Sequence, residues 1–141
     1  MKFIGIDIGS TCAKTTVLDD SREILFQFVQ PTGWSSVDTA EAIRIKLLDN
    51  GIDALHTPCV ATGYGRAAIP YAHKAVTEIT CHAKGACEIF SCRDMTVIDI
   101  GGQDTKIISI EGGMVKDFMM NDKCSAGTGR FLEVMANTLA V

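Results

Sequence analysis

With 141 residues, the chain has the length of one ordinary domain with a single core. A hydrophobic fraction of 47% and a charged fraction of 21% indicate a globular protein and exclude a disordered one. The formal net charge of −4, without any basic run, argues against nucleic-acid binding, and no apolar stretch approaches the roughly 18–20 residues that span a bilayer. An acid and a glycine interrupt the N-terminus where a signal peptide is apolar, so we expect a cytoplasmic protein with reduced cysteines.

The first part of the chain predicts a strand meander followed by helices. Apolar and β-branched runs bounded by turn residues predict strands at residues 3–9, 14–18 and 23–29. Apolar positions at helical spacing predict a helix at 37–48, with Ser35 or Ser36 as its N-cap and Asn50-Gly51 at its end. Residues 59–61 predict a brief buried strand, 67–72 a weak helix interrupted by Pro70, and 78–90 a better helix.

The opening pattern then returns. Strands are predicted at residues 96–102, 104–110 and 114–119, followed by a helix at 130–139. Three strands and a helix therefore occur twice, offset by about ninety residues. Because the second copy stops after its first helix, we expect one complete α/β unit at residues 1–94 and the truncated start of a second at 95–141. We interpret the chain as a fragment or as one that pairs with another chain.

The two strand–turn–strand segments have the composition of phosphate-binding loops. Asp7-Ile-Gly-Ser-Thr11 and Asp99-Ile-Gly-Gly-Gln-Asp104 each place a carboxylate and glycine at the end of an apolar strand. Glycine lets the backbone approach an oxyanion, the turn amides and hydroxyls hold phosphate, and Asp7 and Asp99 are candidate Mg²⁺ ligands. A single Asp-Ile-Gly is a common strand end, but two in matching contexts favour a nucleotide site. The candidate phosphate-binding residues are Gly9, Ser10, Thr11, Gly101 and Gly102.

Further side chains beside these turns are candidates for charge stabilisation and catalysis. Lys14 and Lys106 either add positive charge at the phosphates or are strand lysines that face solvent. Asp104 is positioned to orient a water on the γ-phosphate as general base, and its neighbour Gln103 is a second candidate catalytic residue. If the two units face each other across a cleft, the two loops would hold one nucleotide from opposite sides.

Cys124 is the most suggestive of the six cysteines. It lies in a turn of small residues just before the predicted helix at 130–139, where unpaired amides and the helix dipole stabilise a thiolate. A free cysteine in a tight turn is the alternative. Cys59 and Cys87 are interpreted as small buried hydrophobes. Cys81 and His82 are adjacent on a helix and point about 100° apart, so we expect helix packing for Cys81 and an interdomain or surface contact for His82.

These motifs together resemble a known family. The duplicated loops resemble the phosphate-1 and phosphate-2 loops of the acetate kinase/sugar kinase/Hsp70/actin superfamily. Several stretches resemble the ATP-dependent activators of 2-hydroxyacyl-CoA dehydratases, which are relatives of the ATPase subunits of benzoyl-CoA reductase. These stretches are residues 5–11, 61–66, 78–83, 97–104 and 121–131, and the resemblance covers nearly the whole chain.

The resemblance implies a ribonuclease H-like actin/Hsp70 ATPase fold and an activase that uses ATP and Mg²⁺. Such a protein would be a homodimer with one [4Fe-4S] cluster between its subunits, and Cys124 matches the first cluster cysteine. ATP hydrolysis would drive one electron to a 2-hydroxyacyl-CoA dehydratase or benzoyl-CoA reductase-type partner, with ferredoxin or flavodoxin as the reductant. The second cluster cysteine and the adenosine loop would lie beyond Val141, so we expect the fragment itself to be inactive. A small-molecule kinase, which has no use for Cys124, and a non-enzymatic nucleotide sensor remain alternatives.

Overall fold

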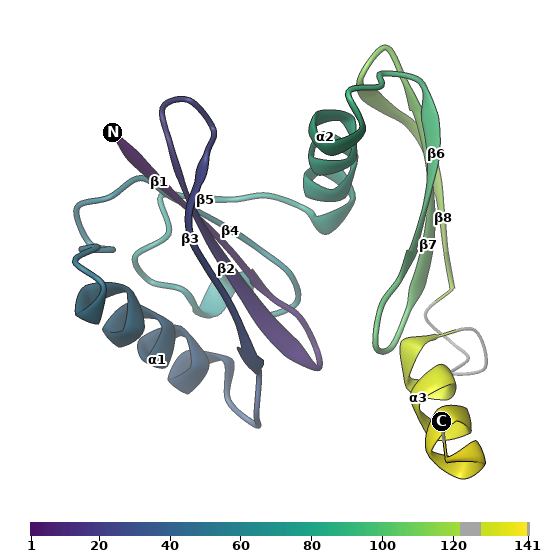
Figure 1. Cartoon of the computed structure of the whole chain (residues 1–141), viewed down its shortest axis with the longest axis horizontal. Helices are drawn as coiled ribbons and strands as arrows, with labels where there is room; N and C mark the ends of the chain where they lie inside the picture. The colour runs from purple at the N-terminus through teal and green to yellow at the C-terminus, as the bar shows by residue number, and fades with distance from the viewer. Residues whose placement is uncertain (122–127, 141) are drawn as a thin grey trace. The chain divides into compact units, whose positions relative to one another are not determined.

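The structure, a computed structural model, describes residues 1–121 and 128–140 (Figure 1). Backbone contacts divide it into two compact units, Met1–Glu78 and Ile79–Val141. The sequence repeat places the boundary after residue 94. The contact boundary lies earlier because helix α2 (Glu78–Phe90) packs on the sheet of the second unit, with Ala83 beside Ile108 and Ile110.

The first unit is built on a five-stranded sheet with the order β3-β2-β1-β4-β5. Strands β1, β2 and β3 form an antiparallel meander, β4 pairs parallel to β1, and β5 pairs parallel to β4. The meander and the short buried strand that follows it confirm the elements predicted from the sequence. The strands are β1 Lys2–Ile8, β2 Cys12–Asp19, β3 Ile24–Pro31, β4 Cys59–Thr62 and β5 Lys74–Ala75.

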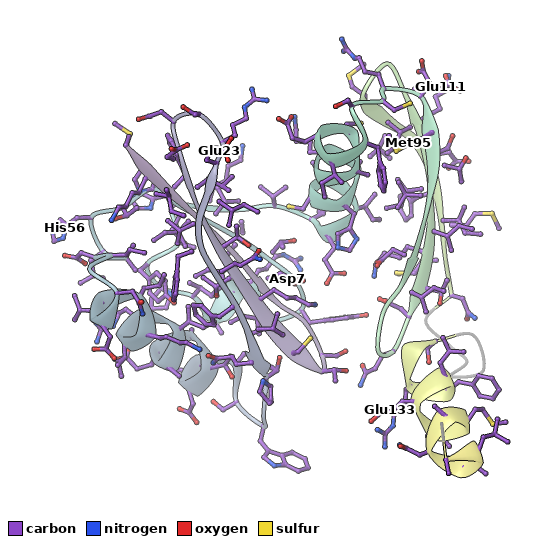
Figure 2. All side chains as sticks on the ribbon, in the orientation of Figure 1. Asp7, Glu23, His56, Met95, Glu111 and Glu133 are labelled. Carbon is purple, nitrogen blue, oxygen red and sulfur yellow. The ribbon has the colours of Figure 1, made fainter. Side chains whose placement is uncertain are left out.

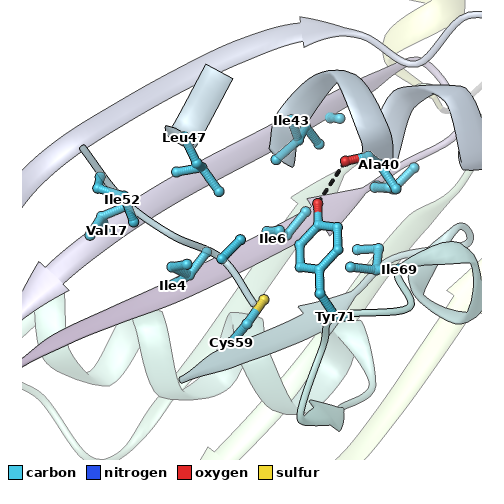
Figure 3. Close-up of a cluster of buried hydrophobic side chains, with 14 residues drawn as sticks. Ile4, Ile6, Val17, Ala40, Ile43, Leu47, Ile52, Cys59, Ile69 and Tyr71 are labelled. Carbon is cyan, nitrogen blue, oxygen red and sulfur yellow. Dashed lines mark hydrogen bonds between the residues drawn. The ribbon is translucent and has the colours of Figure 1, made fainter. Parts of the chain in front are cut away.

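Helix α1 (Ser36–Asp49) covers one face of this sheet and closes the core shown in Figure 3. Successive strand residues point to opposite faces of a sheet. Alternate residues of β1 therefore point toward α1 and pack against it. Tyr71 joins this core, and its hydroxyl donates a hydrogen bond of 2.7 Å to the Ala40 carbonyl. At the start of α1, the Ser35 side chain accepts from the Asp38 amide, as the predicted N-cap requires. The core residues include Ile4, Ile6, Ile8, Val17, Ala40, Ile43 and Leu47.

The second unit contains a three-stranded antiparallel sheet in the order β6-β7-β8. Its strands are Met95–Ile100, Thr105–Glu111 and Met114–Asn121, and α3 spans Gly129–Leu139. The predicted helix that begins near residue 130 is confirmed. Within the described ranges, each helix is too short or too polar to cross a bilayer.

The structure confirms the internal repeat down to local irregularities. A register shift interrupts the β2–β3 pairing between Val17 and Leu18, and another interrupts β7–β8 between Ser109 and Ile110. These two bulges lie 92 residues apart. The loop after the third strand also returns to the same glycine carbonyl in both units, through Thr32 to Gly9 and through Gly129 to Gly101. The two copies therefore share backbone geometry as well as the order of their elements.

The two copies differ in how their helices cover the sheet. In the first unit, Ile6 and Thr15 are buried on the face beneath α1. Their counterparts 92 residues later, Ile98 and Ile107, are exposed, and no residue of α3 is buried. The second sheet is covered on the opposite face, by α2.

The predicted helix at residues 67–72 is wrong. Only a 3₁₀ turn forms there, over Arg66–Ala68, and Ile69 adopts an extended backbone with φ −100° and ψ 94°. Pro70 explains the difference, because proline disfavours helical geometry in the preceding residue and has no amide hydrogen of its own. The two-residue strand β5 was not predicted, since so short a strand carries no periodicity.

Candidate functional site

The first candidate loop is the hairpin turn between β1 and β2. Asp7 and Lys14 face each other across the two strands, and Lys14 Nζ donates to Asp7 Oδ2 at 3.0 Å (Figure 2 labels Asp7). The Gly9 amide donates to the Cys12 carbonyl at 3.1 Å and closes the turn. The candidate residues Ser10 and Thr11 lie within this turn, where Thr11 is exposed. The carboxylate, the ammonium and the turn are thus brought together at one sheet end.

Lys14 contacts only one of the two carboxylate oxygens of Asp7. Burial alone would lower the pKa of the Lys14 ammonium, but the hydrogen bond and charge of Asp7 raise that pKa above its usual value. Both effects of Asp7 on Lys14 act through a contact at Oδ2. Asp7 Oδ1 is buried and has no hydrogen-bond partner in the described part of the chain. A buried carboxylate oxygen of this kind suits a hydrated metal ion or another bound donor.

The second candidate loop, between β6 and β7, has the same construction. Asp99 and Lys106 face each other across the strands, with Lys106 Nζ 3.4 Å from Asp99 Oδ2. The Gly101 amide donates to the Asp104 carbonyl at 2.8 Å. Each of these residues lies 92 positions after its counterpart in the first loop, so Asp104 occupies the position that Cys12 occupies there. The two turns share this backbone hydrogen bond and differ in the three side chains after the glycine, which are Ser10, Thr11 and Cys12 in the first and Gly102, Gln103 and Asp104 in the second.

Lys106 and Asp104 form a buried ion pair that has no counterpart in the first loop. Lys106 Nζ lies 2.7 Å from Asp104 Oδ1, and each residue is only 4% exposed. The interpretation of Lys106 as a solvent-facing strand lysine is therefore wrong, whereas the Lys14 side chain is 47% exposed. Gln103 is exposed at the tip of the turn, and Gly102 beside it is half-buried.

His82, from helix α2, completes the second site. Its Nδ1 lies 3.1 Å from Asp99 Oδ2. The contact with His82 is the largest cause that lowers the pKa of Asp99; burial opposes it, and Lys106 adds to it. The sequence predicted an interdomain or surface contact for His82 but did not identify Asp99 as its partner, and the contact boundary places both residues in the second unit. The available signal was that His82 follows Ile79 by three residues and so borders the face of α2 that packs on the sheet. No group of three metal-ligating side chains occurs among the residues that the structure describes.

Two glycines bring the backbone close to these carboxylates. Gly63 has φ +88°, and a Cβ there would lie 2.4 Å from Asp7 Oδ1 and 2.3 Å from the Ile8 carbonyl oxygen. A Cβ on Gly101 would lie 2.7 Å from Asp104 Oδ1. A side chain at either position would displace the carboxylate. Both loops therefore depend on glycine for the placement of an acid.

Cys124 lies outside the described residues. The helix that follows it begins at Gly129, whose amide donates to the Gly101 carbonyl at 2.7 Å. Thr128, the N-cap residue of α3, is only 1% exposed. The start of α3 is thus joined by a backbone hydrogen bond to the turn of the second candidate loop.

The fold and the two matched turns define the class of protein. The chain has an α/β fold of the actin/Hsp70-like ATPase class. Residues 4–141 match the model of the BadF/BadG/BcrA/BcrD ATPase family, so the chain belongs to that family.

The chain is also similar to named relatives and to solved structures. The (R)-2-hydroxyglutaryl-CoA dehydratase activating ATPase of Acidaminococcus fermentans is 46% identical over 98% of this chain and 54% of its own length. The crystal structure of component A of that dehydratase superposes with a TM-score of 0.87 at 43% identity, covering 100% of this chain and 55% of the other. The activator of 2-hydroxyisocaproyl-CoA dehydratase from Clostridium difficile with bound ADPNP gives a TM-score of 0.87 at 37% identity, covering 100% and 53%. The chain therefore spans about half the length of these relatives.

Proposed function

We propose that the protein carrying this sequence is an ATP-hydrolysing activator. It couples hydrolysis to the transfer of one electron, at low potential, from a [4Fe-4S] cluster to a 2-hydroxyacyl-CoA dehydratase or benzoyl-CoA reductase-type partner. The observation that carries the proposal is the pair of matched hairpin turns, each with a carboxylate and a lysine across the strand ends. Several of its relatives are named as activators of 2-hydroxyacyl-CoA dehydratases, and the solved structure of one of them contains bound ADPNP.

The residues of the two turns suit an Mg²⁺-nucleotide. Mg²⁺ prefers carboxylate and water oxygens, and Asp7 Oδ1 is a buried oxygen with no partner in the described part of the chain. In this proposal Asp7 and Asp99 hold the hydrated ion. The Gly9 amide closes the first turn, and in this proposal the amides and hydroxyls of Ser10 and Thr11 bind one side of the phosphates. The Gly101-Gly102 backbone of the second turn binds the phosphates as well. Lys14, which is half-exposed, adds positive charge at the phosphates.

Hydrolysis needs a group that orients the attacking water. We assign that role to Asp104, assisted by Gln103 at the exposed tip of the turn. Lys106 lies between Asp104 and Asp99, at 2.7 Å and 3.4 Å from their oxygens, and holds both carboxylates on one ammonium.

The second loop is joined by a hydrogen bond to the helix that follows Cys124 in the sequence. The hydrogen bond from Gly129 to Gly101 joins the start of α3 to the turn that would hold the phosphates. Cys124 lies five residues before Gly129 and is the proposed cluster ligand. A [4Fe-4S] cluster needs four thiolates. A homodimer in which each full-length subunit supplies Cys124 and a second cysteine would meet that requirement, with ferredoxin or flavodoxin as its reductant.

The test is anaerobic purification of the full-length protein and of two variants, Cys124→Ser and the control Cys92→Ser. Cys92 is an exposed cysteine of the second unit. The proposal predicts absorbance near 400 nm in the wild type and in Cys92→Ser, ATP-dependent reduction of the partner dehydratase, and loss of both in Cys124→Ser. A colourless wild-type protein that phosphorylates a small acceptor would instead establish a kinase. A colourless protein that binds ATP without turnover would establish a nucleotide sensor.

A further inference from the structure

Thr62 presents a buried hydroxyl that the fold itself does not explain. It is the last residue of β4, is 9% exposed, and its Oγ1 has no hydrogen-bond partner in the described ranges. Burying a hydroxyl without a partner costs free energy, so such groups in folded proteins usually bind water or a ligand.

Asp7, which lies opposite Thr62 in the sheet, also has a buried oxygen without a hydrogen-bond partner in the described residues. Strands β1 and β4 pair in parallel with Asp7 opposite Thr62, so the two side chains lie on one face of the sheet. Asp7 Oδ1 is likewise buried without a partner in the described residues. Gly63 packs directly beneath that oxygen, since a Cβ there would lie 2.4 Å away. Two unpartnered oxygens thus lie side by side at the end of the strand that leads into the first candidate loop.

We propose that Thr62 Oγ1 and Asp7 Oδ1 together hold one water molecule of the hydrated Mg²⁺ that accompanies the nucleotide. This makes Thr62 a further positioning residue, and the inference rests on the proposed function. Mg²⁺ keeps several of its waters when bound to proteins, and each of those waters needs acceptors for its hydrogens. A carboxylate oxygen and a hydroxyl oxygen are two such acceptors.

Thr15 supplies a matched control in the same sheet. It is also buried, at 1% exposed, and its Oγ1 also lacks a partner in the described ranges. Thr15 pairs with Ile6 and Phe28, and it lies on the face that α1 covers, away from Asp7. Its hydroxyl therefore lies on the face of the sheet opposite to Asp7. Replacement of either threonine by valine removes one hydroxyl with little change of shape.

The experiment measures ADP affinity by titration calorimetry in the full-length protein, once with Mg²⁺ and once with EDTA. The variants are Thr62→Val, Thr62→Ser and Thr15→Val. We expect Thr62→Val to weaken Mg²⁺-ADP binding about tenfold and to leave ADP binding in EDTA unchanged, as the loss of an outer-sphere partner does. Thr62→Ser, which restores a hydroxyl, and Thr15→Val should bind Mg²⁺-ADP within twofold of the wild type.

The outcomes separate this inference from the proposed function. Equal Mg²⁺-ADP affinity in Thr62→Val and wild type overturns the inference, as does an equal loss with and without Mg²⁺. If Thr62→Val does not fold, Thr62→Ala takes its place, with the same two outcomes. A wild-type protein that binds no Mg²⁺-ADP overturns the proposed function itself.

Discussion

At the scale of single residues, the two hairpins show how one backbone supports two chemistries. Both turns close with the same amide-to-carbonyl bond, and both carry a carboxylate opposite a lysine. The side chain at the turn differs, since Cys12 in the first loop corresponds to Asp104 in the second. A buried carboxylate needs a cation beside it, and the buried Lys106 ammonium is that cation for Asp104. We therefore propose that the first loop serves binding and that the second serves both binding and water activation.

Replacing Asp104 with Asn should slow ATP hydrolysis by roughly 10²–10⁴-fold, because a general base acts mainly in the transition state. Mg²⁺-ADP binding should change by less than about threefold. Steady-state hydrolysis and calorimetry on the full-length protein measure the two quantities. Cys12→Ser, at the matched position of the other turn, is the control and should keep the hydrolysis rate. Turnover at the wild-type rate in Asp104→Asn would remove Asp104 from the mechanism.

Cys59 predicts a pH dependence of the first unit. Burial raises the pKa of its thiol from 9.0 to about 11, so the folded protein keeps the proton longer than the unfolded chain. Between these values the unfolded chain binds fewer protons, and the free energy of unfolding therefore falls as pH rises. The loss should be about 2–3 kcal/mol over the interval. Urea unfolding at pH 8 and pH 11 measures it, with Cys59→Val as the control. A slope that persists in Cys59→Val would assign the effect to other groups.

At the scale of elements, the sequence predicted most strands and helices because their patterns are local. The helix at 78–90 and the repeat of three strands and a helix follow from apolar spacing and turn residues. The failures have physical reasons. Pro70 shortened a predicted helix to a 3₁₀ turn, and β5 is held by pairing with β4 and not by its own residues.

The same limit applies to the candidate site. The carboxylates and glycines were predicted because a turn between strands is a local feature. The burial of Lys106 and its contact with Asp104 depend on the covering of the sheet, and the contact of His82 with Asp99 depends on where α2 packs. Local patterns do not carry that information. The role of each candidate in phosphate binding and hydrolysis stays a prediction.

The turn after β4 offers a test of how closely the elements are packed. Gly51 and Gly63 both have positive φ, at +71° and +88°, but only Gly63 has atoms within reach of an added Cβ. Gly51→Ala should cost roughly 1 kcal/mol of unfolding free energy from backbone strain alone. Gly63→Ala should cost at least about 2 kcal/mol more, because the Ile8 carbonyl must also move. Chemical denaturation of both variants compares them directly. Equal losses would show that the end of β4 tolerates a side chain beside Asp7.

At the scale of the whole molecule, apolar surface in the second unit is left open. The apolar residues of α3, among them Phe131, Leu132 and Met135, are exposed, as are Ile98 and Ile107 on the sheet. So many exposed apolar side chains in one unit are uncommon on monomers when they gather into a patch. We therefore predict that the 141-residue chain self-associates, most simply as a dimer in which residues 96–141 pack against a second copy. Light scattering at tens of micromolar measures the mass, and a clean monomer of 15.1 kDa would contradict the prediction.

We propose above all that both hairpins take part in binding the Mg²⁺-nucleotide. The most direct measurement is calorimetric titration of Mg²⁺-ADP into the full-length protein and into Asp7→Asn, Asp99→Asn and the double variant. We expect each single variant to weaken Mg²⁺-ADP binding at least about tenfold. The double variant should lose less binding free energy than the sum of the two single losses, because both carboxylates act on one ligand. Wild-type affinity in either single variant would contradict the claim, since one hairpin would then take no part in the site.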